Sequence, residues 1–204
     1  MNLLVVLANP KKSSYTRQLM DTFLTSYRSH HPADVITELD LYRQAALPVI
    51  DDSVLQAWAK PAGKLLPEEQ HLLSGIDQYT DQFVAADKVV FAAPMWNLQF
   101  PPLLTAYLAT IMVAGKPFAY TENGICGLVP DKPVLLLHVR GGIYSTGPLQ
   151  PFEHAVPFLR DVCAMVGIRN FRTLLCEGAE MRPDQAGQIL DLSLRQAAQW
   201  AEHF

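Results

Sequence analysis

Three short segments of this chain combine hydroxyl, amide, aromatic and glycine residues in patterns suited to binding a small ligand. The first, residues 9–17, reads Asn-Pro-Lys-Lys-Ser-Ser-Tyr-Thr-Arg and leads into a helix-like stretch. The hydroxyls of Ser14 and Thr16, the basic side chains and the free N–H groups of a helix start together favour an anion such as a phosphate. Simple N-capping by Ser14 would explain one hydroxyl but not the cluster. The segment contains neither a Gly-x-Gly-x-x-Gly nor a Walker lysine motif.

The second segment, residues 92–102, reads Ala-Ala-Pro-Met-Trp-Asn-Leu-Gln-Phe-Pro-Pro and follows a strand-like apolar run. Its backbone N–H groups, the flat surface of Trp96 and the two-way hydrogen-bonding amide of Asn97 suit a planar heterocycle better than a metal or a nucleic acid. An alternative is that Met95, Trp96 and Phe100 belong to the core and that Asn97 only forms a turn. The sequence alone leaves both interpretations open.

The third segment, residues 140–144, reads Arg-Gly-Gly-Ile-Tyr and also follows an apolar run. Paired glycines allow positive φ and let the backbone approach a ligand closely, although for Gly141-Gly142 alone a tight turn is the simpler explanation. All three segments lie at the carboxyl ends of expected strands, and open α/β sheets bind their ligands at that edge. We therefore predict one site built from the three segments.

Other residues that could do chemistry form no recognisable pattern. The six histidines lack metal-ligand spacing, and no Gly-x-Ser-x-Gly elbow of an α/β-hydrolase occurs. His138, inside an expected strand, is better explained as a buried and hydrogen-bonded side chain than as a catalyst. Acidic pairs such as Asp51-Asp52 and Glu68-Glu69 are typical of solvated faces. We therefore predict no metal site and no catalytic pair of carboxylates.

Apolar strand-like runs alternate with helix-like stretches along the whole chain. Strands are expected at residues 3–8, 35–39, 88–93, 133–139 and 171–176. Helices are expected at 16–30, at 102–114, at 151–166 with Gly167 as the C-cap, and from about Pro183 onwards. The alternation predicts an α/β fold, a three-layer, doubly wound, five-stranded parallel sheet that forms a single domain over residues 1–204.

Two stretches, residues 42–69 and 118–130, are longer than compact connections require. Such insertions often form lids, substrate walls or subunit contacts, and plain surface excursions are equally consistent with their sequences. Pro67 could open a helix that runs towards Ala86. Glu122-Asn123-Gly124 is a turn signal of the hairpin type.

Composition and charge narrow the choice of partners and compartment. Of the 204 residues, 50% are hydrophobic and 18% charged, and the net charge is −4. Lysines and arginines are scattered, which indicates no nucleic-acid footprint and no polybasic membrane patch. The apolar start lacks a basic n-region and is too short to span a membrane. Three widely separated cysteines without CxxC spacing fit free thiols in a reducing cytoplasm.

Several motifs, taken in order, resemble those of one known family. They are Ala-Ala-Pro-Met-Trp-Asn at 92–97, Phe-Ala-Tyr-Thr-Glu-Asn-Gly-Ile-Cys-Gly-Leu-Val at 118–129, Arg-Gly-Gly-Ile at 140–143 and Glu-Gly at 177–178. The chain resembles the FMN-dependent NADH:quinone oxidoreductases known as azoreductases, which belong to the flavodoxin-like superfamily. The resemblance covers essentially the whole chain and implies a flavodoxin-like version of the expected fold.

The resemblance implies a bound FMN that is held by all three segments. Its phosphate would lie at the first segment, its isoalloxazine against the second with Asn97 at the ring edge, and its pyrimidine side against the third. Arg140 and backbone N–H groups there would stabilise negative charge on the reduced flavin. The implied cofactor-binding residues are Asn9, Ser14, Tyr15, Thr16, Pro94, Met95, Trp96, Asn97, Leu98, Val139, Arg140, Gly141, Gly142 and Tyr144.

The implied reaction is a ping-pong, two-electron reduction of quinones and azo compounds, with NADH or NADPH as the electron donor. Because the flavin would carry the chemistry, the resemblance implies no obligatory catalytic acid or base. The expected apolar walls of the substrate pocket are Phe100, Phe118, Tyr120 and Trp96. Members of this family are homodimers with the flavin at the interface, so residues 118–129 are expected to contribute to the partner's site. Two alternatives remain open: an electron carrier of the flavodoxin type without direct NADH turnover, and a scaffold that has lost its cofactor and serves as an interaction subunit.

Overall fold

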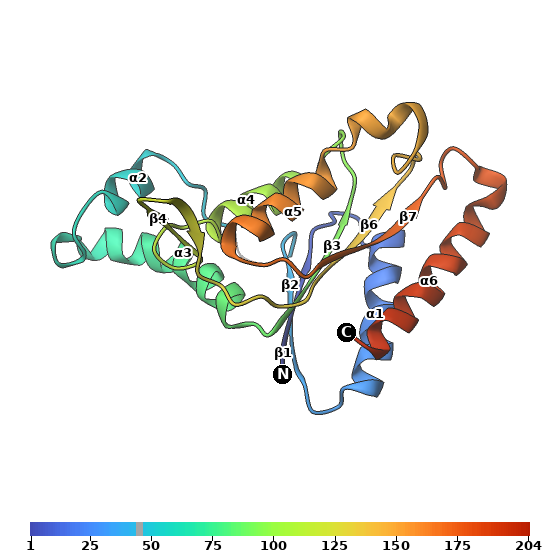
Figure 1. Ribbon diagram of the computed structural model, residues 1–204, viewed down its shortest axis with the longest axis horizontal. Helices are drawn as coiled ribbons and strands as arrows, with labels where there is room; N and C mark the ends of the chain where they lie inside the picture. Colours follow the sequence, from blue (N-terminus) through green and yellow to red (C-terminus); the bar gives the residue numbers. More distant parts are fainter. Residues whose placement is uncertain (44–46) are drawn as a thin grey trace.

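A parallel β-sheet with helices on both faces forms the body of the molecule. The computed structural model describes residues 1–43 and 47–204. Its main sheet has five parallel strands in the order β2-β1-β3-β6-β7 (Figure 1). These strands are β1 Asn2–Leu7, β2 Val35–Asp40, β3 Lys88–Pro94, β6 Val134–Arg140 and β7 Phe171–Glu177. The expected doubly wound α/β fold is confirmed, and each expected strand lies within one residue of its observed bounds.

The central strands are buried on both faces, which explains their nearly continuous apolar sequences. In β1, Leu4 and Val6 belong to one hydrophobic core, while Leu3, Val5 and Leu7 belong to the other. Successive residues of a strand point to opposite faces, so one short apolar run contributes to both cores.

Helices close the two cores from opposite sides of the sheet, giving three layers (Figure 1). Two helices pack side by side on one face, α1 (Tyr15–His30) and α6 (Ala186–Glu202). The other face is covered by α3 (Pro67–Ala85), α4 (Pro102–Thr110) and α5 (Ala155–Val166). None of the helices in the described residues combines the length and the apolar character needed to cross a bilayer.

The helix expected at 102–114 is shorter in the structure, where α4 ends at Thr110. The buried hydroxyl of Thr80 in α3 donates a hydrogen bond to the Thr110 carbonyl at 2.6 Å. This side chain satisfies one of the carbonyls that a helix end leaves without an intrahelical partner, so the helix can stop inside the core.

The helix expected at 151–166 is divided into a 3-10 helix, η2 (Gly147–Phe152), and α5. Glu153 starts the second helix because its carboxylate accepts hydrogen bonds from the N–H groups of Ala155 and Val156, at 3.1 Å and 3.0 Å. Gly167 is the C-cap of α5, with φ of 108°, as the sequence predicts. A further 3-10 helix, η3 (Pro183–Gln185), leads into α6 at the expected position.

The insertion at 118–130 contains an antiparallel hairpin outside the main sheet, made of β4 (Phe118–Thr121) and β5 (Gly124–Gly127). The predicted turn joins the two strands. Just after the hairpin, the N–H of Val129 donates a hydrogen bond to the Val166 carbonyl at the end of α5, at 3.0 Å. The insertion is therefore tied to the helical layer.

The insertion at 42–69 contains a short helix, α2 (Asp52–Trp58), and a 3-10 helix, η1 (Ala62–Lys64). Residues 44–46 within it lie outside the described residues. The helix predicted from Pro67 towards Ala86 is confirmed as α3.

Candidate functional site

A cavity of about 640 Å³ opens at the carboxyl edge of the sheet, beside the ends of β1, β3 and β6. Ligand-binding clefts commonly have volumes of this order. The cavity brings together residues of all three predicted segments, namely Asn9, Ser14, Tyr15, Thr16, Pro94, Met95, Trp96, Val139, Arg140 and Gly141. The rest of its lining consists of Pro10, Lys11, Ser13, Ala179 and Glu180. The other expected cofactor-binding residues belong to the same loops without lining this cavity: Asn97, Leu98, Gly142 and Tyr144.

The loop after β1 is held in shape by its own side chains. The Asn9 amide donates to the Ser14 hydroxyl at 3.0 Å and accepts from the Lys11 N–H at 2.9 Å. Ser14 is the N-cap of α1, and its hydroxyl accepts from the Arg17 N–H at 3.2 Å. The N-capping role considered for Ser14 in the sequence is therefore confirmed. It leaves the other N–H groups of the first turn for an anion in the cavity.

Thr16, in the first turn of α1, carries the least satisfied polar group of this loop. The side chain is 1% exposed, and its hydroxyl has no hydrogen-bond partner within the described protein. A buried polar group without a partner is costly, on the order of 1–3 kcal/mol. Because Thr16 also lines the cavity, its hydroxyl is placed to bond a ligand there.

The loop after β3 makes a tight turn with an uncommon backbone. Trp96 and Gln99 exchange two backbone hydrogen bonds, of 2.6 Å and 3.1 Å. The two central residues, Asn97 and Leu98, have positive φ angles of 50° and 67°. Asn tolerates this region, but a leucine there is strained, and such strain is concentrated at functional sites. Trp96 is 46% exposed at the cavity, so it does not belong to the core.

The loop after β6 differs from the sequence-based expectation at Arg140. Its side chain was expected to face the ligand, but it is 1% exposed and lies in ion pairs. Its guanidinium is 2.8 Å from the Glu177 carboxylate and 3.8 Å from that of Glu153. A buried cation needs such partners, because removing it from water unpaired is very costly. Arg140 nevertheless lines the cavity, and its Nε and Nη2 atoms have no hydrogen-bond partner within the described protein, so its role towards a ligand stays a prediction.

A fourth loop, after β7, completes the cavity, and its residues Ala179 and Glu180 were not assigned to the site from the sequence. The Glu180 N–H donates to the Gly141 carbonyl at 3.0 Å, which joins this loop to the one after β6. A Cβ on Gly141 would lie 2.2 Å from the Glu180 carboxylate, so the missing side chain makes room for Glu180. The sequence signal for this loop was the Glu177-Gly178 pair at the end of β7. Gly178 has a φ of 89°, in the left-handed region that favours glycine.

Of the four aromatic residues expected to form substrate walls, Trp96 lines this cavity, and Phe100, Phe118 and Tyr120 do not. Phe100 and Phe118 are only 3% and 4% exposed and belong to the core beneath α3, α4 and α5. In the single chain their side chains pack between the layers, and their role as substrate walls stays a prediction. Tyr120, by contrast, is 71% exposed on the hairpin, with its ring edge-on to Phe118 at 5.5 Å.

His138 is the buried, hydrogen-bonded histidine that the sequence predicts. Its Nδ1 donates to the Ala93 carbonyl at 2.9 Å, and the ring packs edge-on against Phe100. Burial disfavours the charged imidazolium and lowers the pKa of His138 to about 3. The ring is therefore neutral near pH 7 and serves packing rather than proton transfer.

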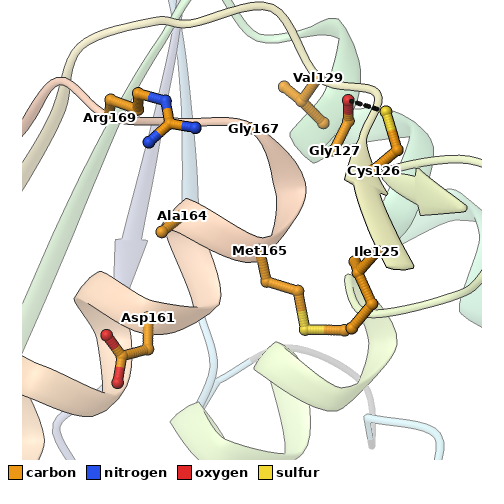
Figure 2. A pocket seen from close by; sticks show the side chains of 9 residues that line it. All are labelled: Ile125, Cys126, Gly127, Val129, Asp161, Ala164, Met165, Gly167 and Arg169. Carbon is orange, nitrogen blue, oxygen red and sulfur yellow. Dashed lines mark hydrogen bonds between the residues drawn. The ribbon is translucent and has the colours of Figure 1, made fainter. Parts of the chain in front are cut away.

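A second cavity, also of about 640 Å³, lies between the hairpin and the end of α5 (Figure 2). Figure 2 shows the Met165 side chain reaching from α5 towards Ile125 of β5. The residues around it include the exposed thiol of Cys126, whose hydrogen-bond acceptor is the Gly127 carbonyl at 3.6 Å. No residue of the loops after β1 and β6 lines this cavity.

Across residues 1–43 and 47–204, no three His, Cys, Asp or Glu side chains are grouped so that they could hold a metal ion.

The order β2-β1-β3-β6-β7, with a cavity at the carboxyl ends of β1 and β3 where the strand order reverses, is the arrangement of flavodoxin-like proteins. The model of a family described as "Flavodoxin-like fold" matches residues 1–201. The chain therefore belongs to the flavodoxin-like family, and its similarity to the proteins below places it with the FMN-dependent NADH:quinone oxidoreductases and azoreductases.

Relatives match this chain from end to end. The FMN-dependent NADH:quinone oxidoreductase 1 of Listeria monocytogenes (serotype 4b, strain F2365) is 42% identical, over 100% of this chain and 99% of the relative. The crystal structure of an azoreductase from Bacillus anthracis (strain Sterne) superposes with a TM-score of 0.93 at 38% identity, covering 100% of both chains. An FMN-dependent NADH-azoreductase from Bacillus anthracis (strain Ames Ancestor), solved in complex with FMN, has a TM-score of 0.91 at 26% identity over 98% of both chains. The resemblance stated from the motifs is confirmed.

Proposed function

We propose that this protein is an FMN-dependent NAD(P)H oxidoreductase that reduces quinones and azo compounds by two electrons. Relatives that match it over its full length carry these activities in their names, as NADH:quinone oxidoreductases and azoreductases. The observation in this structure that carries the proposal is the unpartnered, buried hydroxyl of Thr16, which lines a cavity at the β1/β3 switch point. Flavodoxin-like proteins bind FMN at this position.

The residues around the cavity fit the chemistry of FMN. Ser14, Thr16 and the N–H groups at the start of α1 would hold the phosphate, and Lys11 adds positive charge. Trp96 and the backbone of the neighbouring turn offer a flat surface and donors for the ring. When bound, FMN supplies the hydride chemistry that carries two electrons from NADH or NADPH to the acceptor.

The remaining residues proposed to bind the cofactor are assigned by the loop in which each one lies. Asn9 would support the phosphate loop through Ser14, while the turn at Asn97 and Leu98 would lie along the ring edge. The backbone of 139–142 would face the pyrimidine side and supply N–H donors where negative charge develops on reduction. No side chain of the chain is required as a catalytic acid or base in this assignment.

Absorbance spectra test this function against the flavodoxin-type carrier. Purified protein is expected to be yellow, and anaerobic NADH or NADPH is expected to bleach the flavin rapidly, with colour returning when a quinone is added. The long insertions and only mildly acidic charge favour the enzyme over the carrier. A bound flavin that neither nucleotide reduces would contradict the enzyme. Colourless protein that cannot be reconstituted with FMN would instead support a scaffold without cofactor.

The protein is further proposed to act as a homodimer, with the hairpin of one chain completing the partner's flavin site. Large apolar side chains of the hairpin region are exposed in the single chain: Tyr120 by 71%, Ile125 by 52% and Leu128 by 48%. Apolar surface gathered in this way marks interaction sites. A second copy is the partner that also explains why Tyr120, an exposed residue expected as a substrate wall, does not line the cavity of its own chain.

Sedimentation equilibrium is expected to give twice the chain mass of 22.7 kDa. Tyr120→Asp is expected to shift the protein towards monomer and to raise the KM for quinone, because it places a charge in the apolar interface. Leu192→Asp is the matched control, since Leu192 is 59% exposed on α6, which lies on the other face of the sheet. A monomeric wild type, or equal effects of the two variants, would contradict the proposed interface.

We also propose a cytoplasmic location. All three cysteines are free thiols, and Cys126 is exposed while Cys163 and Cys176 are buried. Burial raises the pKa of the Cys163 thiol to about 12, so this residue is unreactive. Exposed free thiols persist in a reducing compartment. Cell fractionation checks this proposal, and recovery of the protein outside the cytoplasmic fraction would contradict it.

A further inference from the structure

Glu177, the last residue of β7, collects hydrogen bonds from the loop that follows β6. Its Oε2 accepts from the N–H groups of Tyr144 and Ser145, at 3.0 Å and 3.3 Å. Its Oε1 accepts from the Ser145 hydroxyl. Because hydrogen bonds to a charged acceptor are stronger than neutral ones, one carboxylate that accepts three of them restricts the loop backbone.

The charge of Glu177 is balanced from the neighbouring strand. β6 and β7 pair so that Arg140 lies opposite Glu177, and the guanidinium Nη2 is 2.8 Å from Oε2. The Nη1 atom of Arg140 is 3.8 Å from Glu153, whose carboxylate starts α5. Arg140 is 2% exposed, so these contacts are formed with little competition from water. The loop after β6 is thereby connected to two strands and to α5.

Glu177 itself does not line the cavity, whereas Gly141 of the anchored loop does. The same loop is also joined to the β7 side by the bond from the Glu180 N–H to the Gly141 carbonyl. The carboxylate therefore has no direct access to a ligand in the cavity. It can influence a ligand only through the loop.

We propose that Glu177 is a positioning residue for FMN, which holds residues 141–145 in the conformation that lets the backbone at Gly141 and Gly142 approach the flavin ring. The proposal rests on the proposed function, because it assigns the loop to FMN. It explains why Arg140 is buried: the arginine neutralises the carboxylate that anchors the loop.

The test measures the loop and the ligand separately, with Glu177→Ala, Glu177→Gln and Ser145→Ala. Amide hydrogen exchange at Tyr144 and Ser145 is followed by NMR in the apoprotein, and FMN binding is followed by fluorescence titration. Glu177→Ala is expected to speed exchange at Tyr144 and to weaken FMN binding, each by about tenfold or more, since hydrogen bonds to a charged acceptor are lost. Glu177→Gln keeps an acceptor oxygen and is expected to retain much of the affinity.

Glu153→Gln is the matched control, because Glu153 lies beside the same guanidinium but bonds the start of α5 rather than the loop. It is expected to leave exchange at Tyr144 and the FMN dissociation constant within about twofold of wild type, as its amide oxygen can still cap α5. An equal loss of affinity in Glu153→Gln and Glu177→Ala would show a charge effect on Arg140 and would overturn the positioning role.

Faster exchange without weaker FMN binding in Glu177→Ala would identify a purely structural anchor and would also overturn the proposal. Should Glu177→Ala fail to fold, the exposed Ser145→Ala decides in its place. That variant removes one of the three bonds to the carboxylate, so it is expected to speed exchange at Ser145 and to weaken FMN binding by about threefold. Unchanged exchange together with unchanged affinity would refute the anchoring. If wild-type protein bound no FMN, the proposed function would fail, while the exchange rates in the apoprotein would still report whether Glu177 holds the loop.

Discussion

Thr16→Val is expected to leave the apoprotein at least as stable as wild type while weakening FMN binding by about tenfold or more. The hydroxyl of Thr16 is buried and has no partner within the described protein, so an apolar group of the same shape removes a desolvated polar atom. The bound phosphate would supply the missing partner, and a hydrogen bond to a charged group is among the stronger ones. Stability and affinity therefore change in different directions. Urea unfolding of the apoprotein and titration with FMN measure the two quantities.

Ser14→Ala is the matched control for this prediction. Its hydroxyl is already engaged, since it accepts from the Asn9 amide and from the Arg17 N–H. Its loss is therefore expected to destabilise the apoprotein by about 1 kcal/mol, as for other N-caps, besides weakening FMN binding. A Thr16→Val apoprotein that is clearly less stable than wild type, or one with wild-type FMN affinity, would refute the assigned role of the hydroxyl.

Gly127→Ala is expected to destabilise the protein by about 2–3 kcal/mol, the usual cost of forcing extra atoms into a packed contact. A Cβ at this position would lie 2.3 Å from the Gly167 nitrogen and 2.4 Å from the Val166 carbonyl carbon, both of them backbone atoms. Gly167 is equally constrained, because a Cβ there would lie 2.6 Å from the Val129 carbonyl oxygen. The two glycines let the hairpin backbone lie directly against the end of α5.

Thermal unfolding of the apoproteins checks this expectation. For a chain of this size, the predicted loss corresponds to a fall in Tm of roughly 5–10 °C. Gly75→Ala provides the control, because Gly75 lies within α3 and an added Cβ would meet no atom within 4 Å. That substitution is expected to raise stability by about 0.5–1 kcal/mol through helix propensity. A Gly127→Ala protein as stable as wild type would show that the hairpin can move away from α5 at little cost.

The main sheet could be predicted from the sequence almost residue by residue. Apolar runs such as 88–93 and 133–139 are bounded by turn residues and are too short for buried helices, so each has one interpretation. The helix bounds were less predictable where side chains from other segments end or start a helix. The Thr80 hydroxyl at the end of α4 is distant in sequence from the carbonyl it satisfies, and a local pattern does not contain this information.

Within the candidate site, residue types and loops were predictable, but side-chain directions were not. The loops after β1, β3 and β6 meet because parallel strands end at the same edge, and the alternating pattern already implies this. Glu180 was missed because the Glu177-Gly178 motif at the start of its loop does not extend to it. Phe100 and Phe118 were assigned to a pocket because aromatic residues suit both a core and a ligand wall, and only their burial distinguishes the two.

The sequence by itself determined the α/β class with its five parallel strands, the sheet edge at which the three predicted loops meet and the chemical groups available there, because hydrophobic periodicity and turn chemistry are local properties of the chain. Only the tertiary structure decided that the Arg140 guanidinium is buried against Glu177. It likewise decided that Thr16 keeps a free buried hydroxyl and that Gly127 lies against Gly167. Each of these depends on which distant segments the packed layers bring together, and on the cost of leaving a buried charge or polar group without a partner.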